Sequence, residues 1–287
     1  MTDPVQTLLD LLSIERLEQD LFRGIGSGGE TSKRIFGGQV VAQALAAAYH
    51  TVEDRACHSL HAYFLRPGDP SIPVIYEVDR ARDGGSFTTR RVIAIQHGRQ
   101  IFNMAASFHA EEDSPSHQHD MPDAPAPEGL EDRLERRAAM VDRVPEERRK
   151  DFLRPSPIEV REVEPVDPLD PQVSSDRHSL WFRVARPVDG PAWLHQCLLT
   201  YASDMYLLSS AMRPHGESYM SGRVMTASLD HAVWFHRPAR FDEWHLYTMD
   251  SPFSGGARGF NRGAIYSSDG ALVASTAQEG LTRPLRK

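Results

Sequence analysis

The sequence predicts an α+β fold of two tandem units, each an antiparallel sheet wrapped round one central helix. The first observation is an internal repeat: residues 64–67 followed by Gly84-Gly85 return as residues 235–238 followed by Gly255-Gly256, with the same spacing between the two parts. The second observation is that a helix-like stretch precedes each copy of the repeat. The third is that four strand-like runs, separated by turn residues, follow the helix-like stretch in both halves.

The bulk composition is ordinary for a globular protein. With 287 residues, 40% hydrophobic and 25% charged, the chain is long enough for two domains. A net charge of −8 argues against nucleic acid or an anionic membrane as a partner. The chain shows no leader-like segment and no apolar run approaching the length of a membrane span. We therefore expect a reduced, cytoplasmic protein in which Cys57 and Cys197 are free thiols, although the sequence leaves a disulfide between them open.

The first unit is expected to begin with a helix and a strand. Asp3 can cap a helix with Pro4 at its first position, and Gln6 is placed to reach back as in a capping box. Alternation from Leu17 to Gly24 predicts a half-buried strand. The predicted helix at 39–49 has a face of small apolar residues, which lets a sheet approach closely. Four strands should follow, at residues 57–65, 72–82, 86–96 and 100–110.

The second unit repeats this order after a polar linker. Residues 111–157 are rich in acids, prolines and arginines and predict a linker with a polar helix, so the predicted units are residues 1–110 and 158–287. In the second unit we expect strands at 158–163 and 179–185, a helix from about 192 to 212, and four strands up to Glu279. The first of these four strands is expected to run unbroken from Val224 to His236.

Two patterns that look like ligand-binding motifs are set aside. The run Gly24–Gly29 has the glycine spacing of a dinucleotide-binding loop, but no helix opens on Gly29 and no βαβ unit follows, so a turn is expected. His117 and His119 have no further cysteine or histidine at a ligand spacing. We therefore expect neither a cofactor nor a metal ion.

Three polar residues of the second unit form the candidate site. Asp204 lies at the edge of the apolar face of the predicted helix, and a partly desolvated carboxylate there is either paired or functional. Ser228 lies in the first strand after that helix, on the face opposite to the apolar one, and Gln278 lies at the end of the last strand. Two such units side by side leave a tunnel between them, and ligands favour such seams.

A carboxylate, a hydroxyl and an amide together can hold a water molecule. A fixed water beside a carboxylate can be activated as a nucleophile by general-base catalysis, and positioning removes much of the entropic barrier. An acyl carbonyl would also need donors for its developing negative charge, and backbone N–H groups after Gly37-Gly38 at a helix N-terminus are candidates. The sequence pattern alone does not bring the three residues together.

Six separated motifs cover nearly the whole chain outside the linker. They are FGGQVV at 36–41, FLRPGD at 64–69, GGSF at 84–87, YASD at 201–204, DHAVWFHRP at 230–238 and QEG at 278–280. This set resembles the acyl-CoA thioesterase II family, whose fold is a double hot dog. The resemblance implies hydrolysis of acyl-CoA to a free fatty acid and CoA by a directly activated water. It places the family's Asp, Thr or Ser, and Gln at Asp204, Ser228 and Gln278, and serine keeps the hydroxyl but loses a methyl group.

One active site per chain is expected. The repeat aligns Ala106 of the first unit with Gln278 of the second, allowing for one inserted residue in the second-unit turn. No acid or hydroxyl set in the first unit replaces the missing amide. The first unit has therefore lost at least one polar group of the site.

The histidines near the motifs offer rival general bases, because imidazole commonly serves in that role. His58 is the main rival, and its alternative interpretation is a hydrogen-bonded core or interface histidine. Ser228 as a covalent nucleophile is disfavoured, because no Gly-x-Ser-x-Gly turn surrounds it. The histidines in or next to the motifs are His58, His61, His195, His231 and His236.

The expected substrate has an anionic part and an apolar part. CoA is polyanionic, so arginines after the two glycine turns are candidates to bind it, with solvated strand edges as the alternative. The acyl chain is expected along apolar surface between the units, near Tyr206 or Trp234. The arginines in question are Arg90, Arg91, Arg258 and Arg262.

Two other functions are kept as alternatives. An enoyl-CoA hydratase of the same fold class would carry a histidine five residues after its aspartate, whereas Ser209 stands at that distance from Asp204. A non-catalytic acyl-CoA-binding module would need the tunnel but not the residues that hold water. In each case exposed sheet edges favour a homo-oligomer.

Overall fold

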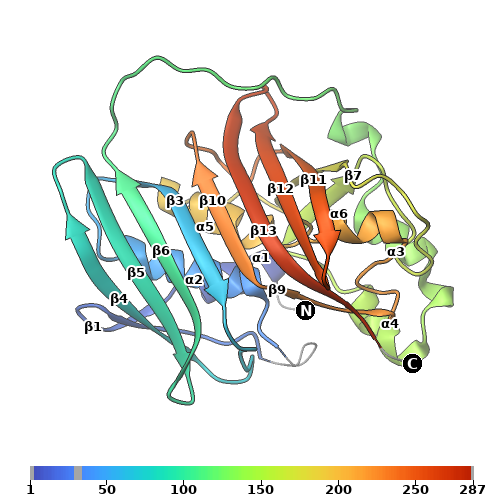
Figure 1. The fold of residues 1–287 in the computed structure, drawn as a ribbon, viewed down its shortest axis with the longest axis horizontal. Coiled ribbons are helices and arrows are strands. Elements are labelled where there is room, and N and C mark those ends of the chain that lie inside the picture. Colours follow the sequence, from blue (N-terminus) through green and yellow to red (C-terminus); the bar gives the residue numbers. More distant parts are fainter. Residues whose placement is uncertain (1–2, 29–33, 286–287) are drawn as a thin grey trace.

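One antiparallel sheet runs through both halves of the chain. The computed structural model describes residues 3–28 and 34–285, and its strands lie in front of the helices in Figure 1. Within the described residues the sheet has the strand order β1-β2-β4-β5-β6-β3-β10-β13-β12-β11-β8-β7, with β9 paired to β13. Strand β3 of the first half and β10 of the second half are hydrogen bonded to each other, so the two sheets are continuous.

The first half has the predicted order of elements except at its first strand. The prediction of a single strand over 17–24 is wrong, because β1 (Glu15–Glu18) and β2 (Leu21–Gly24) form a hairpin there. Gly28 adopts a left-handed φ of 86° after this hairpin, while Gly29 lies outside the described residues. The remaining elements are α1 (Pro4–Leu12), α2 (Gly37–Tyr49), β3 (Ala56–Phe64), β4 (Val74–Asp83), β5 (Phe87–Gln96) and β6 (Arg99–His109).

Helix α1 begins as predicted but without a capping box. The side chain of Asp3 accepts a hydrogen bond from the backbone N–H of Val5 at 2.9 Å, and Pro4 is the first helical residue. The prediction for Gln6 is wrong, because its side chain donates to Asp10, one turn further along the helix. The buried face of α1 packs against the hydrophobic core.

The second half departs from the predicted elements at two points that matter for the site. The predicted helix over 192–212 is interrupted: α5 (Ala192–Ser203) ends with Asp204 as its C-cap, and α6 (Ser209–Met212) follows after a turn. The predicted strand over 224–236 is broken between Ser228 and Asp230. The elements of this half are β7 (Ile158–Glu162), β8 (His178–Val184), η3 (Arg213–His215), β9 (Val224–Ser228), β10 (Asp230–Phe235), β11 (His245–Gly255), β12 (Arg258–Ser267) and β13 (Leu272–Pro284).

The polar segment between the halves contains short helices. These are η1 (Pro127–Gly129), α3 (Arg133–Ala139), η2 (Val141–Arg143) and α4 (Glu146–Phe152). Asp132 caps α3 by accepting hydrogen bonds from the backbone of Leu134 and Glu135. The boundaries of the linker at 111 and 157 remain a prediction.

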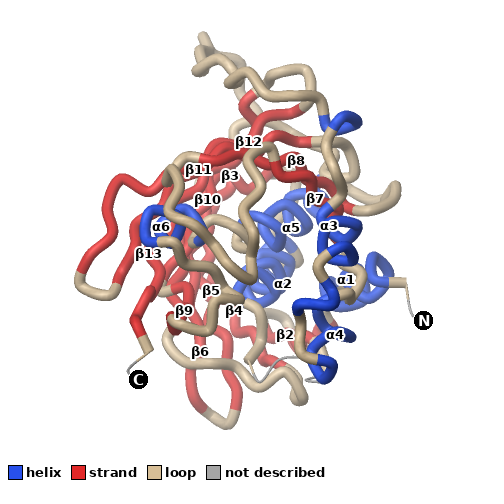
Figure 2. Tube along the Cα trace, turned by 90° about the vertical axis from the view of Figure 1, so that its right-hand side faces the viewer, coloured by secondary structure: helices blue, strands red, loops and turns tan. Residues whose placement is uncertain are grey.

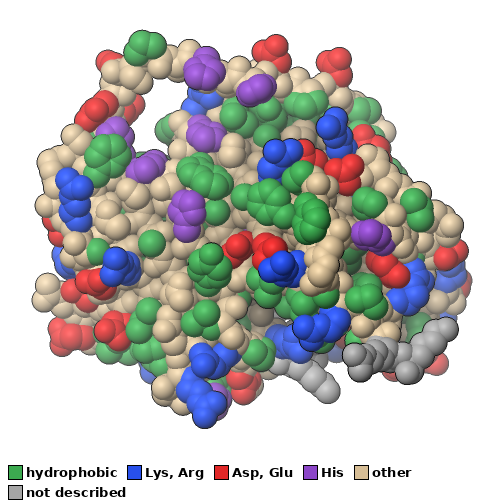
Figure 3. Space-filling model, in the orientation of Figure 1, with side chains coloured by type: hydrophobic (Ala, Val, Ile, Leu, Met, Phe, Trp, Pro, Cys, Tyr) green, Lys and Arg blue, Asp and Glu red, His purple; other side chains and the backbone are tan. Residues whose placement is uncertain are grey.

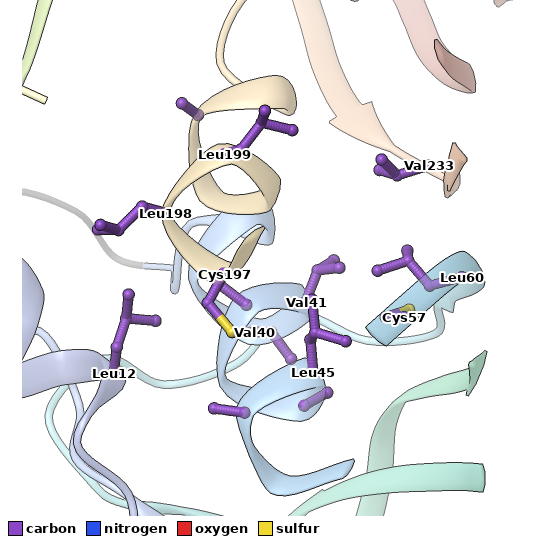
Figure 4. Close-up of a cluster of buried hydrophobic side chains, with 14 of the residues drawn as sticks. Leu12, Val40, Val41, Leu45, Cys57, Leu60, Cys197, Leu198, Leu199 and Val233 are labelled. Atoms are coloured by element: carbon purple, nitrogen blue, oxygen red, sulfur yellow. The ribbon is translucent and has the colours of Figure 1, made fainter. Parts of the chain in front are cut away.

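Helices α2 and α5 lie side by side against the inner face of the sheet, as the two views agree (Figures 1 and 2). They run antiparallel, since Gly38 near the start of α2 meets Tyr201 near the end of α5, and Tyr49 at the end of α2 meets Trp193. Figure 4 shows side chains of both helices beside Leu60 of β3 and Val233 of β10. The core of the molecule is therefore shared between the two halves.

Two predictions about this core are met. Cys57 and Cys197 are both buried and both free thiols, as expected. Helix α2 is lined by small residues such as Ala44 and Ala47, which are fully buried against neighbouring elements. The α+β fold class, with a helix under each half of an antiparallel sheet, is confirmed.

Gly38 should be intolerant of a side chain. A Cβ at this position would lie 2.3 Å from the carbonyl oxygen of Tyr201. Because this oxygen belongs to the backbone of α5, moving it would distort the helix. We expect Gly38→Ala to lower the free energy of unfolding by about 1–3 kcal/mol, as overpacking typically does. Urea unfolding would measure the change. Gly85→Ala is the matched control, because a Cβ there meets nothing within 4 Å, and equal stability of the two variants would contradict the prediction.

Candidate active site

A cavity of about 670 Å³ lies between the two halves of the chain. Its wall combines the start of α2 and the end of β3 with the turn after α5 and the end of β9. A seam of this kind between units is where a ligand is expected to bind. Residues that line it from the first half include Arg34, Phe36, Gly37, Phe64 and Arg66, and those from the second half include Asp204, Met205, Leu208, Tyr219 and Ser228.

The three predicted site residues meet at this cavity. Oδ1 of Asp204 accepts a hydrogen bond from Oγ of Ser228 at 3.0 Å and another from Nε2 of Gln278 at 2.5 Å. Asp204 is 6% exposed and lines the cavity together with Ser228, whereas Gln278 is fully buried behind them and is not part of the wall. Gln278 is in the middle of β13 rather than at its end, which corrects the sequence prediction.

A break in the strand directs Ser228 toward Asp204. In an unbroken strand Ser228 and His231 would point to opposite faces, because side chains alternate. Here both point at the end of α5, since Ser228 bonds Asp204 and His231 bonds Ser203. Two hydrogen bonds stabilise the break. The backbone N–H of Leu229 donates to the carbonyl oxygen of Glu279, and the backbone N–H of Glu279 donates to the side chain of Asp230 at 2.6 Å.

Helix α2 supplies the other side of the carboxylate. The backbone N–H of Gly38 forms a hydrogen bond to Asp204, so the N-terminus of a first-half helix reaches a second-half residue. A Cβ on Gly37 would lie 2.7 Å from Oδ2 of Asp204, so only glycine leaves room for this oxygen. The N–H groups of this N-terminus are predicted to stabilise the negative charge on the acyl carbonyl oxygen. One of them, that of Gly38, instead donates to Asp204.

The environment leaves Asp204 able to take up a proton near neutral pH. Burial raises its pKa to about 6, while the hydrogen bonds from Gln278, Ser228 and Gly38 act in the opposite direction. A carboxylate with such a pKa is ionised at pH 7 yet remains a usable base. The combination of burial, perturbed pKa and a cavity is typical of a functional site.

The structure brings a different histidine to the site than the one predicted as a rival base. His58 of β3 bonds Ser107 and packs edge-on against Phe87, and it does not line the cavity. His231 instead lies directly behind Gln278, with its Nδ1 3.2 Å from Nε2 of that amide. It belongs to a sequence motif, but alternation along an unbroken strand placed it on the face opposite to Ser228.

The arginines singled out by the sequence do not line the cavity. Arg90 is 2% exposed and bonds Thr51 and Asp83, so its predicted contact with CoA is wrong. Arg91 lies opposite Asp79 in the β4–β5 register, Arg262 pairs with Asp250, and Arg258 lies near Glu279. The arginines that line the cavity are Arg34 and Arg66. Neither follows one of the two glycine turns, so the sequence criterion missed them.

The aromatic residues expected near the acyl chain lie elsewhere. Trp234 packs edge-on against His61, and it is absent from the cavity wall. Tyr206 lines a separate, smaller pocket of about 120 Å³, where Arg133 lies over its ring. Tyr219 borders both cavities. The apolar wall of the main cavity comes instead from residues such as Phe64, Phe102, Met205 and Leu208.

Residues 3–28 and 34–285 contain neither a cluster of metal ligands nor a membrane-spanning helix. Within them, no group of three or more histidine, cysteine, aspartate or glutamate side chains could hold a metal ion. Over the same residues, no helix is long and apolar enough to cross a membrane.

The strand register agrees with the alignment of the two halves. Leu60 of β3 pairs with Ala106 of β6. The register of β10 with β13 pairs Ala232 with Ala277, and continuing it by one residue sets His231 beside Gln278. Leu60 and His231 hold equivalent places in the repeat, so two apolar residues of the first half correspond to two polar residues of the site.

Comparison with known proteins identifies the family. Residues 148–281 match the family described as acyl-CoA thioesterase, and residues 28–109 match the acyl-CoA thioesterase N-terminal domain. Acyl-CoA thioesterase 2 of Haemophilus influenzae is 38% identical over 99% of both chains. Acyl-CoA thioesterase II TesB2 from Mycobacterium marinum is 40% identical, with a TM-score of 0.78 over 97% of this chain and 98% of that one.

The fold also extends to a more distant structure. A hot-dog protein from Alicyclobacillus acidocaldarius, described as a conserved protein of unknown function, is 19% identical with a TM-score of 0.77 and covers 100% of both chains. This likeness supports the double hot-dog fold alone. The full-length relatives, the two matched segments and the shared fold together show that the chain belongs to the acyl-CoA thioesterase II family.

Proposed function

We propose that the chain hydrolyses fatty acyl-CoA to a free fatty acid and CoA, using a water molecule held by the site of Asp204, Ser228 and Gln278, in which Gln278 acts by fixing Asp204. Membership of the family makes the chain a thioester hydrolase. The observation that supports the residue roles is the pair of hydrogen bonds that join Ser228 and Gln278 to one oxygen of Asp204 at the cavity. An apolar wall that includes Phe64 and Leu208 supports a fatty acyl chain as the group bound there.

The two oxygens of Asp204 have different tasks in this mechanism. Oδ1 already accepts hydrogen bonds from Ser228 and Gln278, which fix the plane of the carboxylate. Oδ2, beside Gly37, carries neither of these bonds and is the oxygen that receives a proton from water. Because Ser228 donates its own proton to Asp204, its oxygen remains free to accept the second O–H of the water.

The reaction then follows general-base chemistry. The water oxygen attacks the thioester carbonyl carbon as Asp204 removes a proton, and a tetrahedral intermediate forms. Its collapse breaks the carbon–sulfur bond, and the proton on Asp204 neutralises the departing thiolate of CoA. The N–H of Gly37, which lines the cavity at the start of α2 and has no acceptor within the helix, is a suitable donor to the carbonyl oxygen.

Two arginines on the cavity wall are suited to the CoA part of the substrate. Arg34 and Arg66 both line the cavity from the first half, and both are exposed. Guanidinium groups bind phosphates through paired hydrogen bonds. The anionic end of the substrate would lie along this side of the cavity while the thioester meets Asp204.

We also propose that the protein works in the cytoplasm as a homo-oligomer. Its two free, buried thiols suit a reducing compartment. The outer face of the sheet carries hydrophobic side chains among histidines (Figure 3), and Tyr63 on β3 is 59% exposed. Such a face suits contact between copies of the chain.

Light scattering of the purified protein would give its mass in solution, and a monomer would refute the assembly.

The three side chains should be individually required. We expect Asp204→Ala, Ser228→Ala and Gln278→Ala each to lower kcat by at least about tenfold, as loss of a general base or positioning group does. Release of CoA from palmitoyl-CoA, detected with a thiol reagent, measures this. Ser275→Ala is the matched control, since Ser275 is on the same strand as Gln278 but bonds His236. Full activity of Asp204→Ala would refute the mechanism, and failure of the wild type on all chain lengths would favour a binding module.

The rate should fall in acid. Asp204 must be ionised to accept a proton from water, and burial raises its pKa to about 6. We therefore expect kcat/KM to be level above about pH 7 and to fall roughly tenfold per pH unit well below pH 6. A series of initial rates between pH 5 and 8 tests this expectation. A profile that stays level down to pH 5 would show that the base is not Asp204.

The charge on Asp204 should cost stability. Its pKa is raised in the folded state to about 6 from 3.8, so the ionised form disfavours folding, fully above pH 6 and not at all below 3.8. We expect Asp204→Asn to raise the free energy of unfolding by about 1–3 kcal/mol at pH 7.5, at about 1.4 kcal/mol per pKa unit as an upper bound. Urea unfolding at pH 7.5 and pH 5 measures the difference, which should shrink at the lower pH. A less stable variant at pH 7.5 would contradict this.

A further inference from the structure

A chain of buried hydrogen bonds lies behind the proposed catalytic residues. Ser203 bonds the carbonyl of Thr200 at 2.9 Å, and its Oγ lies 2.9 Å from Nε2 of His231. Nδ1 of His231 in turn lies 3.2 Å from Nε2 of Gln278. Ser203, His231 and Gln278 are all fully buried. None of the roles assigned above uses Ser203 or His231.

The direction of each hydrogen bond in this chain follows from its partners. The carbonyl of Thr200 can only accept, so the Ser203 hydroxyl donates to it and must accept from Nε2–H of His231. Nδ1 of His231 therefore carries no proton and accepts an N–H from Gln278. Burial lowers the pKa of His231 to about 4, which agrees with a neutral ring at pH 7.

The amide of Gln278 has two acceptors to satisfy with one NH2 group. One N–H points to Oδ1 of Asp204 and the other to Nδ1 of His231, while its Oε1 is buried and has no hydrogen-bond partner among the described residues. Turning the amide over would set Oε1 against both acceptors and leave each without its donor. The orientation is therefore fixed from two sides.

The contribution of His231 grows during the reaction. Once Oδ2 of Asp204 has taken a proton from water, Oδ1 becomes the carbonyl oxygen of a neutral acid. It still accepts from the NH2 end of Gln278, but more weakly than a carboxylate oxygen does. His231 does not change and still requires an N–H. Its acceptor therefore supplies a larger share of the hold on the amide until the carboxylate is restored.

We propose that His231 is a positioning residue that holds the amide of Gln278 with its NH2 group toward Asp204 throughout the catalytic cycle. This inference rests on the proposed function, because it assigns the role through Gln278. His231 does not contact the cavity, and it takes no proton from water. Ser203 supports it by fixing which ring nitrogen carries the proton.

Two substitutions separate positioning from simple packing. His231→Leu keeps a similar volume but has no acceptor, whereas His231→Asn places a carbonyl oxygen on the side-chain carbon that bears Nδ1 in histidine. We expect the leucine variant to lose about tenfold or more in kcat with KM nearly unchanged, and the asparagine variant to stay within a few-fold of wild type. Wild-type kcat in a folded leucine variant, or equal losses in both variants, would overturn the proposal.

A double substitution tests whether His231 acts through Gln278. We expect His231→Leu to cause no further loss of kcat in a Gln278→Ala background, because the amide that it orients is gone. Independent, multiplying losses would overturn the positioning role. If Gln278→Ala alone kept full activity, the proposed function would fail instead, so the two failures are distinct.

A third variant keeps the test decisive if the leucine variant does not fold. Ser203→Ala leaves His231 in place but removes the acceptor of its Nε2–H, so the proton can move to Nδ1 and displace the Gln278 donor. We expect a several-fold lower kcat with KM nearly unchanged. Thermal unfolding of each variant confirms that it is folded at the assay temperature, and an unchanged kcat in Ser203→Ala would overturn the proposal.

Discussion

The structure around the cavity depends on keeping one carboxylate buried without losing its charge. Asp204 caps the C-terminus of α5, where the partial negative charge of the helix end disfavours a carboxylate. Donors from three other elements offset this: Ser228 from β9, Gln278 from β13, and the N-terminus of α2 at Gly38. The antiparallel arrangement of the two helices is what brings that positive helix end to Asp204. Neither half of the chain could hold this carboxylate alone.

The fold class could be predicted from sequence because it depends on a pattern that both halves share. The three polar residues could be located because the motifs around them resemble those of a known family. The repeat of residues 64–67 at 235–238 gave the order of elements, and the motifs located Asp204, Ser228 and Gln278. The local geometry of the site could not be predicted. Its helix stops at Ser203 and its strand breaks at Leu229, and the bonds that hold this strand break reach Glu279, a residue far along the chain. The periodicity of side chains within one segment carries no information on contacts with a distant segment.

Contacts between distant segments also explain why the predictions for His231 and Arg90 were wrong. Alternation along an unbroken strand sends His231 away from Ser228, and only the break turns both toward α5. Arg90 follows a glycine turn, as a substrate contact would, yet its guanidinium group is buried and bonds Thr51 and Asp83. In the equivalent places of the first half, Leu60 and Ala106 stand where the second half has a linked polar pair. Removing one member of a buried hydrogen-bonded pair leaves the other without its partner at a cost in stability, which favours keeping or losing the two together.

The hydrogen-bonded junction of β3 with β10 also limits how the molecule can move. Many enzymes with a site between two domains admit the substrate by a hinge motion that separates them. Here five residue pairs, from Asp230–Tyr63 to Trp234–Ser59, bind the halves edge to edge, and the paired helices share one core behind them. Opening that seam would break sheet hydrogen bonds and expose apolar core together. Acyl-CoA must therefore enter the cavity, and the products leave it, while the two halves stay joined. The motions that admit them are then motions of side chains and not of whole halves.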